Sequence, residues 1–374
     1  MKVGIVVPYS WSYWGAVPEH AELQAESLRR RGIETRTIIG HDPPGSFTRV
    51  LHPRHGRHGR PPADVIPVGR SVIVPANGAL PNIVLSPSSV PRIKRALREE
   101  RFDVLHLHEP MTPAICVATL AWAPCPVVAT FHASGELGWL KGGKLVWGFL
   151  LDRIDHRIAV SEAARDSVSR YFPADYELIP NGVLIPPEVN AGGREHRVVF
   201  VGRHDPRKGM PVLLRAWPKI HRRTGARLRI VGADPLMVRL ALSRLHRADA
   251  AVEGVDALGF LSQEDLTEEL LSAKALVAPS LGGESFGMVL TRAFACATPV
   301  VASDITGYRD VMTDETGLLV PPGDPDALAN AVVALLEDEP GRRRLGEAAR
   351  GLAQERYSWD DIAGRLAAIY EGLA

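Results

Sequence analysis

The sequence has few cysteines, almost no net charge and no uninterrupted apolar run long enough to cross a membrane. Its 374 residues include three cysteines, Cys116, Cys125 and Cys296, without CxxC spacing. An odd number of isolated cysteines indicates neither a disulfide framework nor a zinc site, and a reducing cytoplasm is the simplest compartment. Lys and Arg total 44 against 43 Asp and Glu. This balance lacks the basic excess that is typical of nucleic-acid-binding proteins.

The longest apolar stretch, residues 114–131, could span a membrane if it formed a single helix. Pro124 and Pro126 interrupt it, so we expect a buried helix over about 114–122 followed by a core strand. The apolar run at the N-terminus is too short for a signal peptide. The sequence therefore predicts a soluble cytoplasmic protein that is at most peripheral to a membrane.

Short apolar segments alternate with helical patterns, and the alternation restarts after a segment rich in Pro, Gly and Asn, Pro180–Gly193. Strands this apolar are buried on both faces, as in a parallel sheet covered by helices. The expected strands are 3–7, 35–39, 104–107, 127–130, 157–160, 197–201, 228–231, 276–278, 299–302 and 317–320. The pattern predicts an α/β protein with two doubly wound, Rossmann-like domains.

We expect an N-terminal domain over residues 1–185, a C-terminal domain over 186–357, and a last helix, 358–374, that packs back on the first domain. Ligands of doubly wound sheets bind beyond the carboxyl ends of the strands. Two facing domains of this kind would place a ligand-binding cleft between them.

Neither domain carries GxGxxG after its first strand, and the chain has no GxxxxGK[ST] segment. A dinucleotide cofactor and P-loop chemistry are therefore not expected. Arg203 and Lys208 instead follow the strand 197–201 and precede a helix. Two cations at a strand end can neutralise a diphosphate and stabilise the oxygen that leaves with it. The alternative is an ordinary solvated turn.

A second segment of this domain joins a glycine pair to an acid and a helix start. Gly282, Gly283 and Glu284 follow a strand, and a helix is expected from about Phe286. Glycines let a ligand approach the backbone, and a helix start offers N–H groups to phosphate. Glu284 would accept hydrogen bonds from sugar hydroxyls, unless it is only an acid favoured by the helix dipole.

In the first domain, polar residues gather at the ends of two neighbouring strands. His106, His108 and Glu109 end one strand, and His132 ends the next. A single histidine at such a position is usually structural, but several polar residues at one edge of a sheet favour a binding site.

These segments, in this order over nearly the whole chain, resemble the retaining glycosyltransferases of the GT-B fold in family GT4. Within that family the likeness is greatest to actinobacterial phosphatidylinositol mannosyltransferases, including the opening Pro8–Ser10. The matching segments are Asp103–Pro110, Thr130–His132, Ile179–Val183, Gly202–Arg203 with Lys208–Gly209, Gly282–Gly287 and Thr316–Pro321.

The resemblance implies a hexosyltransferase that uses a nucleoside-diphosphate sugar, needs no cofactor or bound metal, and acts on a hydroxyl acceptor such as a lipid. The implied catalytic residues are His132, Arg203, Lys208 and Glu284. The implied donor contacts are Gly15, Ala16, Gly202, Phe260, Leu261, Gly283, Ser285, Phe286, Gly287, Met288, Val289 and Arg292. The implied acceptor contacts are Tyr9, Asn77 and His108.

Four positions depart from the family pattern. Arg292 stands where the family has a second Glu for the ribose, which exchanges a hydrogen-bond acceptor for a cationic donor. Ala16 replaces a glycine, Asn82 an arginine that meets inositol phosphate, and Leu266 a lysine near the base. A nucleotide-sugar-binding protein that has lost turnover is therefore the main alternative, and a sugar-nucleotide epimerase is a third.

The near-zero net charge hides a basic region, because residues 29–101 carry 14 basic and 5 acidic residues. Part of it is an expected helix, Ser88–Arg101, and the later segment Lys141–Leu151 mixes lysines with Trp and Phe. Such segments suit an anionic membrane surface, and solvated helices or a soluble anionic acceptor are the alternatives. Three regularly spaced histidines, His52, His55 and His58, lie in a Gly- and Pro-rich loop without an acid, which argues against a metal site.

Overall fold

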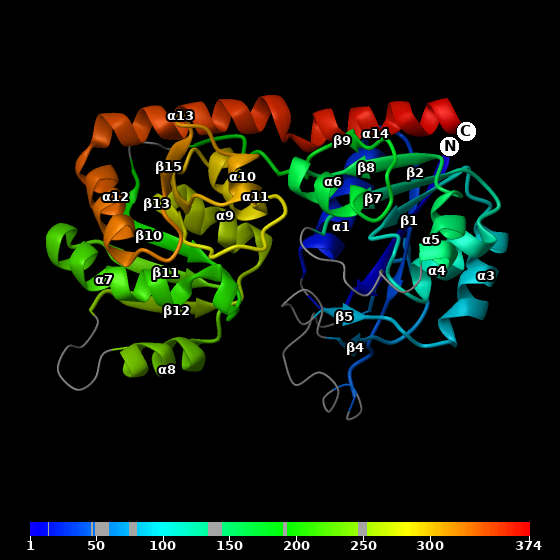
Figure 1. Cartoon of the computed structure of the whole chain (residues 1–374), viewed down its shortest axis with the longest axis horizontal. Helices are drawn as coiled ribbons and strands as arrows, with labels where there is room; N and C mark the ends of the chain where they lie inside the picture. Colours follow the sequence, from blue (N-terminus) through cyan, green and yellow to red (C-terminus); the bar gives the residue numbers. More distant parts are fainter. Residues whose placement is uncertain are drawn as a thin grey trace. The chain divides into compact units, whose positions relative to one another are not determined.

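The computed structural model describes residues 1–13, 15–45, 48, 60–74, 81–133, 144–189, 193–245 and 253–374. The chain forms two compact units (Figure 1). Unit 1 comprises Met1–Gly182 with Trp359–Ala374, and unit 2 comprises Val183–Ser358. The boundaries expected from sequence, after residues 185 and 357, differ from these by three residues and one residue.

Unit 1 is built on a sheet whose main strands are all parallel. Their order is β3-β2-β1-β6-β7-β8-β9. These strands are β1 (Lys2–Ser10), β2 (Glu34–Gly40), β3 (Val65–Pro67), β6 (Val104–His108), β7 (Val127–Phe131), β8 (His156–Ala159) and β9 (Glu177–Leu178). A small hairpin, β4 (Val72–Ile73) and β5 (Asn82–Ile83), joins the end of β1 in antiparallel fashion.

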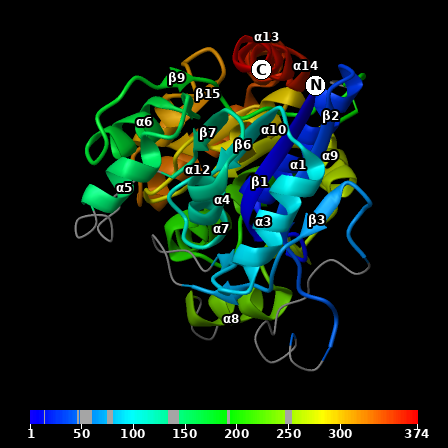
Figure 2. The same ribbon diagram turned by 90° about the vertical axis from the view of Figure 1, so that its right-hand side faces the viewer.

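Helices cover both faces of this sheet (Figure 2). On one face, α1 (Ala16–Arg30) packs beside α14 (Trp359–Leu373), which therefore belongs to unit 1 although it ends the chain. The other face is covered chiefly by α3 (Ser89–Glu100) and α4 (Ile115–Trp122). The described part of this unit also contains α5 (Lys144–Leu151) and α6 (Glu162–Ser169).

The long apolar stretch divides as its prolines predict. It forms α4 and then β7, with Pro124 and Pro126 in the connection between them. All five residues of β7 are buried, as expected for a central strand with helices on both faces. No helix in the described part of the chain is long and apolar enough to cross a membrane.

Unit 2 has a fully parallel sheet in the order β12-β11-β10-β13-β14-β15. The strands are β10 (Glu195–Val201), β11 (Arg227–Val231), β12 (Val255–Gly259), β13 (Ala273–Ala278), β14 (Val300–Ser303) and β15 (Gly317–Val320). One face carries α7 (Met210–Thr224), α8 (Pro235–Leu245) and α12 (Pro325–Glu337). The other carries α9 (Gln263–Ser272) and α10 (Met288–Ala295), with α13 (Glu339–Arg356) against α10 and the short α11 (Thr306–Arg309) nearby. This is the predicted second doubly wound domain.

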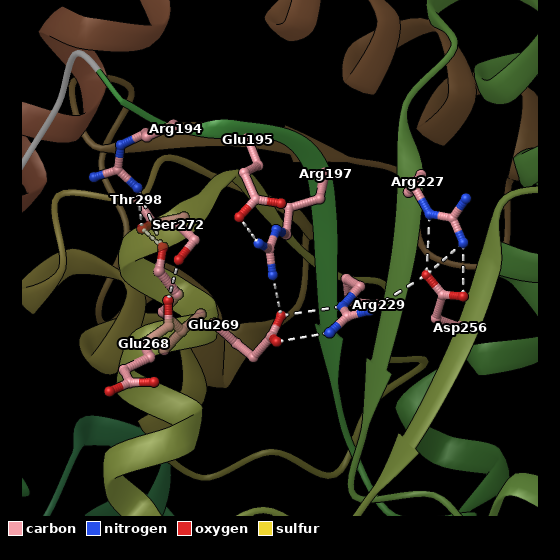
Figure 3. Close-up of polar contacts among 11 residues, drawn as sticks. Arg194, Glu195, Arg197, Arg227, Arg229, Asp256, Glu268, Glu269, Ser272 and Thr298 are labelled. Atoms are coloured by element: carbon pink, nitrogen blue, oxygen red, sulfur yellow. Dashed lines mark hydrogen bonds and ion pairs between the residues drawn. The ribbon is translucent and has the colours of Figure 1, made fainter.

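Ion pairs tie the amino-terminal parts of three strands in unit 2 to α9 (Figure 3). The Glu269 carboxylate lies 2.9 Å from the Arg197 guanidinium and 2.8 Å from that of Arg229. The Asp256 carboxylate lies 2.8 Å from the Arg227 guanidinium and 3.4 Å from that of Arg229. The charges at this edge of the sheet are thus paired with one another, whereas ligands of such sheets bind at the opposite, carboxyl edge.

Candidate functional site

Lys208 and Glu284 meet at the carboxyl edge of the unit 2 sheet. Lys208 ends a 3-10 turn, Pro206–Lys208, that follows β10, and Glu284 lies in the loop after β13. Lys208 Nζ is 2.7 Å from Glu284 Oε1, and the two side chains are 27% and 14% exposed. A pair with this access can exchange partners with a ligand, the ammonium for phosphate and the carboxylate for hydroxyl groups.

Gly209 fixes the distance between the two loops that carry this pair. Its φ is 70°, and a Cβ there would lie 1.7 Å from the carbonyl oxygen of Pro279, just after β13. The N–H of Leu281 donates to the carbonyl of Arg207 at 2.7 Å, which adds a second backbone contact between the same loops. The sequence therefore needs glycine here both for the left-handed backbone and for the close approach.

Arg207 pairs with Asp205, an interaction that sequence reasoning did not predict. The guanidinium Nη2 lies 2.7 Å from Asp205 Oδ2, and the same carboxylate accepts the backbone N–H of Arg207 at 2.9 Å. Burial acts to raise the pKa of Asp205, but the hydrogen bonds from Arg207 outweigh it and lower the pKa. Arg203 lies exposed in the same loop, and Lys208 contacts one oxygen of Glu284 rather than forming a bidentate pair.

Two further residues support Glu284 and were also missed from sequence. Ser280 Oγ lies 3.4 Å from Glu284 Oε1 and 2.8 Å from Tyr308 Oη. Tyr308 is buried, and burial, with a further contribution from Glu284, raises its pKa. Gly307 precedes it, and a Cβ at that glycine would lie 2.0 Å from the carbonyl oxygen of Glu284. The Glu284 loop is therefore packed directly on α11.

The start of α10 is held by aromatic contacts. Gly287 caps this helix with φ 74°, and a Cβ there would lie 2.9 Å from the Tyr308 ring. Phe286 is buried, with its ring edge-on to that of Tyr357 at 5.6 Å between centroids. The partly exposed residues Ser285, Met288 and Val289 flank this point, as Gly283 does in the exposed loop before it. The structure thus presents a helix start at the same edge as the ion pair.

The other predicted donor contacts of unit 2 have different surroundings. Phe260 follows β12 with 57% of its surface exposed, and the adjacent Leu261 is half-buried. Gly202 is buried after β10 against the ring of Phe200. Arg292 lies on α10, where burial lowers its pKa to about 10. Leu266 is buried on α9, so this position belongs to the interior of the unit.

In unit 1, four histidines form one buried cluster. His108 Nδ1 is 2.9 Å from His132 Nε2, and the ring of His20 from α1 lies 5.1 Å from the ring of His132. His106 stacks on His108 and bonds Thr130 Oγ1 at 2.7 Å. His108 has no exposed surface and contacts His132, and its contact with an acceptor stays a prediction. His20 was not predicted, because it lies on a helix far from the strand ends in sequence.

Burial keeps these imidazoles neutral. It lowers the pKa of His106 and of His132 to about 3, and it also lowers the pKa of His20 and His108. Nitrogen atoms of His20, His108 and His132 lie within 4.8 Å of one another, a spacing that could hold a metal ion. His20 Nδ1 and His108 Nε2 have no hydrogen-bond partner among the described residues.

The Asn-Gly pair after β9 packs against this cluster. The side chain of Asn181 hydrogen-bonds the His132 ring, which acts to raise the pKa of His132 against the larger effect of burial. A Cβ on Gly182 would lie 2.4 Å from the ring of Trp359, which begins α14. Asn181 and Gly182 thus pack between the His132 ring and the start of α14.

The other predicted residues of unit 1 that the structure describes, Tyr9, Gly15 and Ala16, lie near the end of β1 or at the start of α1. Tyr9 is half-buried at the end of β1, with its pKa raised by burial and by the nearby Glu109. Gly15 caps α1 and Ala16 begins it, and among the described residues a Cβ on Gly15 would meet Pro18 alone, at 3.4 Å. Asn77 lies outside the described residues, as do the three histidines at 52, 55 and 58.

Comparison with known proteins identifies both halves of the chain. The model for "Glycosyltransferase Family 4" matches residues 17–184, and that for "Glycosyl transferases group 1" matches residues 195–338. The chain is 37% identical to a phosphatidyl-myo-inositol mannosyltransferase of Mycobacterium leprae over 388 residues, covering 100% of this chain and 97% of the relative. The corresponding protein of Propionibacterium freudenreichii is 35% identical and covers 99% of this chain and 94% of its own.

Solved structures show the same fold. HepE of Anabaena, crystallised with UDP and glucose, superposes with a TM-score of 0.70 at 18% identity and covers 99% of both chains. Sucrose-phosphate synthase of Thermosynechococcus elongatus gives 0.71 at 21% identity, covering 100% of this chain and 99% of the other. With its two parallel-sheet units and these relatives, the chain belongs to family 4 of the glycosyltransferases and has the GT-B fold.

Proposed function

We propose that this glycosyltransferase moves a hexose from a nucleoside-diphosphate sugar to a hydroxyl acceptor with retention of configuration. The observation that carries the proposal is the accessible pair between Lys208 and Glu284 at the carboxyl edge of unit 2. On donor binding, Lys208 and Arg203 would turn to the diphosphate and Glu284 to the sugar hydroxyls. Phe260, exposed after β12, is suited to cover a nucleotide base.

The reaction would follow from these placements. The bond between the anomeric carbon and the phosphate oxygen breaks, and a bond to the acceptor oxygen forms on the same face of the sugar. The acceptor proton passes to the leaving phosphate oxygen. Negative charge grows on that oxygen, and two side-chain cations together with the N–H groups at the start of α10 would stabilise it without a bound metal.

For the acceptor we propose a membrane lipid or a polyol phosphate that binds unit 1 near Tyr9 and His132. The mannosyltransferase relatives are named for a phosphatidyl-myo-inositol acceptor. Asn82 replaces the arginine expected for inositol phosphate, and its Oδ1 is buried without a partner among the described residues. The acceptor of this chain therefore need not be the same lipid.

We further propose that unit 1 contacts the cytoplasmic face of an anionic membrane through α3. A cavity of about 540 Å³ there is lined by Lys94, Arg98, Arg101 and Trp122, among others. The Lys94 ammonium lies 3.7 Å from the centroid of the Trp122 ring, and this ring is 44% exposed. Cations beside an exposed indole suit the head-group region of an anionic bilayer.

A donor panel tests the transferase proposal. UDP-glucose, GDP-mannose and related donors are incubated with the protein, and release of the nucleoside diphosphate is measured. We expect slow hydrolysis with at least one donor and its loss in Lys208→Ala. Lys219→Ala is the matched control, because Lys219 also faces a carboxylate, Asp326 at 3.5 Å, but lies exposed on α7. Thermal stabilisation by a donor without any hydrolysis or transfer would instead favour a nucleotide-sugar-binding protein.

Co-sedimentation with phosphatidylglycerol vesicles tests the membrane contact. We expect binding at low salt that weakens as salt is added, because exposed charges are screened. Replacing Lys94 and Arg98 with Gln should reduce it, whereas equal sedimentation with neutral vesicles would contradict an electrostatic contact.

A further inference from the structure

Glu109 joins the ends of two central strands in unit 1. Its backbone N–H donates to the carbonyl of Thr130 at 2.9 Å, and its Oε1 accepts the backbone N–H of His132 at 2.9 Å. The N–H of Ala133 donates to the same carboxylate. The Glu109 carboxylate thus accepts hydrogen bonds from both backbone N–H groups that directly follow β7, those of His132 and Ala133.

This arrangement is costly for the fold. Glu109 has φ 52°, one of four non-glycine residues with positive φ in the described part of the chain, and a left-handed backbone costs on the order of 1 kcal/mol. Its carboxylate is also largely withdrawn from water. Strain and a buried acid together at the ligand-binding edge of a sheet are more typical of functional positions than of packing.

We propose that Glu109 is a positioning residue for the transfer reaction, and that its carboxylate holds the His132–Ala133 backbone in the form that meets the substrate. The inference rests on the transferase function proposed above. His132 has 8% of its surface exposed and its ring is bonded to His108, so its orientation depends on the backbone that carries it. Loss of the carboxylate would release that backbone while the ring stays in the cluster.

The groups that face Glu109 make this hold sensitive to pH. Tyr9 on β1 and Cys116 on α4 are neutral, with pKa values raised by burial and by Glu109 itself. The histidines of the cluster are neutral as well. No cation among these neighbours offsets the charge, and burial raises the pKa of Glu109 to about 7. Glu109 is therefore fully ionised only above neutral pH. The ionised carboxylate is the better acceptor for two N–H groups.

The chain contains a matched control at the other end of the same strand. Asp155 donates its backbone N–H to the carbonyl of Val127 at 2.8 Å and accepts the Val127 N–H on Oδ2, also at 2.8 Å. Asp155→Asn therefore replaces the charged acceptor of this β7 backbone bond with a neutral amide without touching the carboxyl edge. Glu109→Gln makes the corresponding change at that edge.

Two readouts separate the steps of the proposal. The first is the backbone amide shift of His132 in protein labelled with 15N-histidine, followed from pH 5.5 to 8.5 and assigned with His132→Asn. We expect this shift to titrate near pH 7 in the wild type and in Asp155→Asn, and to stay constant in Glu109→Gln. The second is kcat for hydrolysis of the donor that the panel identifies. In the wild type we expect kcat to fall as the pH drops below about 7, and in Glu109→Gln we expect this fall to be absent. At pH 8 the kcat of Glu109→Gln should be about tenfold lower than that of the wild type, a loss of about 1.4 kcal/mol, with an unchanged donor KM.

An amide shift that does not titrate with Glu109 would overturn the proposal whether or not the protein is active. If the amide shift titrates but kcat depends neither on pH nor on the Glu109→Gln substitution, the contact is only structural. That result would also overturn the proposal. If the amide titrates but no donor in the panel is hydrolysed or transferred, the proposed function itself fails, and the role of Glu109 in transfer falls with it.

Discussion

Substituting alanine for Gly209 should damage unit 2 far more than the same change at Gly225. Both glycines have a left-handed backbone, with φ of 70° and 71°. A Cβ on Gly225 would have no heavy atom of the described residues within 4 Å, whereas a Cβ on Gly209 would lie 1.7 Å from the carbonyl oxygen of Pro279. The pair of variants therefore separates backbone strain, which both share, from a steric clash that only Gly209 has.

The magnitudes follow from that difference. Gly225→Ala should cost about 1 kcal/mol, the strain of placing alanine in the left-handed region. Gly209→Ala must in addition move a backbone carbonyl by about 1.5 Å to reach ordinary contact distance, and we expect a total of about 4 kcal/mol or more. The shift would separate the loops of Lys208 and Glu284, so the 2.7 Å contact between them should be lost.

Chemical denaturation of both variants, with thermal melts as a check, gives the free energies of unfolding. At roughly 2–4 °C per kcal/mol, Gly225→Ala should melt about 3 °C below the wild type and Gly209→Ala at least 8 °C below it. Stabilisation by a nucleotide sugar should survive in Gly225→Ala and disappear in Gly209→Ala. Equal losses of stability in the two variants would refute the close approach of the two strand-end loops.

Other predictions concern the polar interior. Arg194 donates to the carbonyls of Leu270, Ala273, Cys296 and Ala297 and to the Thr298 hydroxyl, so Arg194→Met should destabilise unit 2 by about 3 kcal/mol in urea unfolding. Tyr308→Phe should cost about 1 kcal/mol and weaken donor binding severalfold by calorimetry, because Ser280 would lose a partner. Unit 1 should lose stability on acidification, because the pKa of about 3 for His106 and His132 in the folded protein lies below the ordinary 6.5. The contribution of these neutral imidazoles to the free energy of unfolding is complete above pH 6.5 and falls by about 2 kcal/mol per imidazole at pH 5. Denaturant unfolding at a series of pH values measures this loss.

Strands and helices with a strong local sequence pattern were predictable, whereas strands that form only by pairing with a neighbouring strand were not. The strand at 317–320 has the predicted bounds, and the helix expected over about 114–122 spans Ile115–Trp122, because apolar runs and the proline that follows the helix define them locally. The two-residue strands β4, β5 and β9 were missed. They are too short to show a period and exist only because a neighbouring strand pairs with them.

The site was predictable where the chemistry lies in one segment, and less so where it depends on contacts between segments. Motif reasoning named Lys208 and Glu284, and the structure places them in contact. It did not find the pairing of Asp205 with Arg207, or Tyr308 behind Ser280. Tyr308 lies 28 residues from Ser280, on a four-residue helix that has no sequence signature of its own.

Within each unit the two edges of the sheet differ in how their charges are held. At the amino edge of unit 2, Glu269 and Asp256 are saturated by arginines, which stabilises the sheet and leaves little for a ligand. At the carboxyl edge, Lys208 and Glu284 have a single ion-pair contact with each other and remain partly exposed. In unit 1, Glu109 at that edge has no arginine or lysine among the groups that shift its pKa. Charge that is held by one partly exposed contact, or that no cation offsets, can respond to a substrate, so we expect the chemistry of this chain at the carboxyl edges of its sheets.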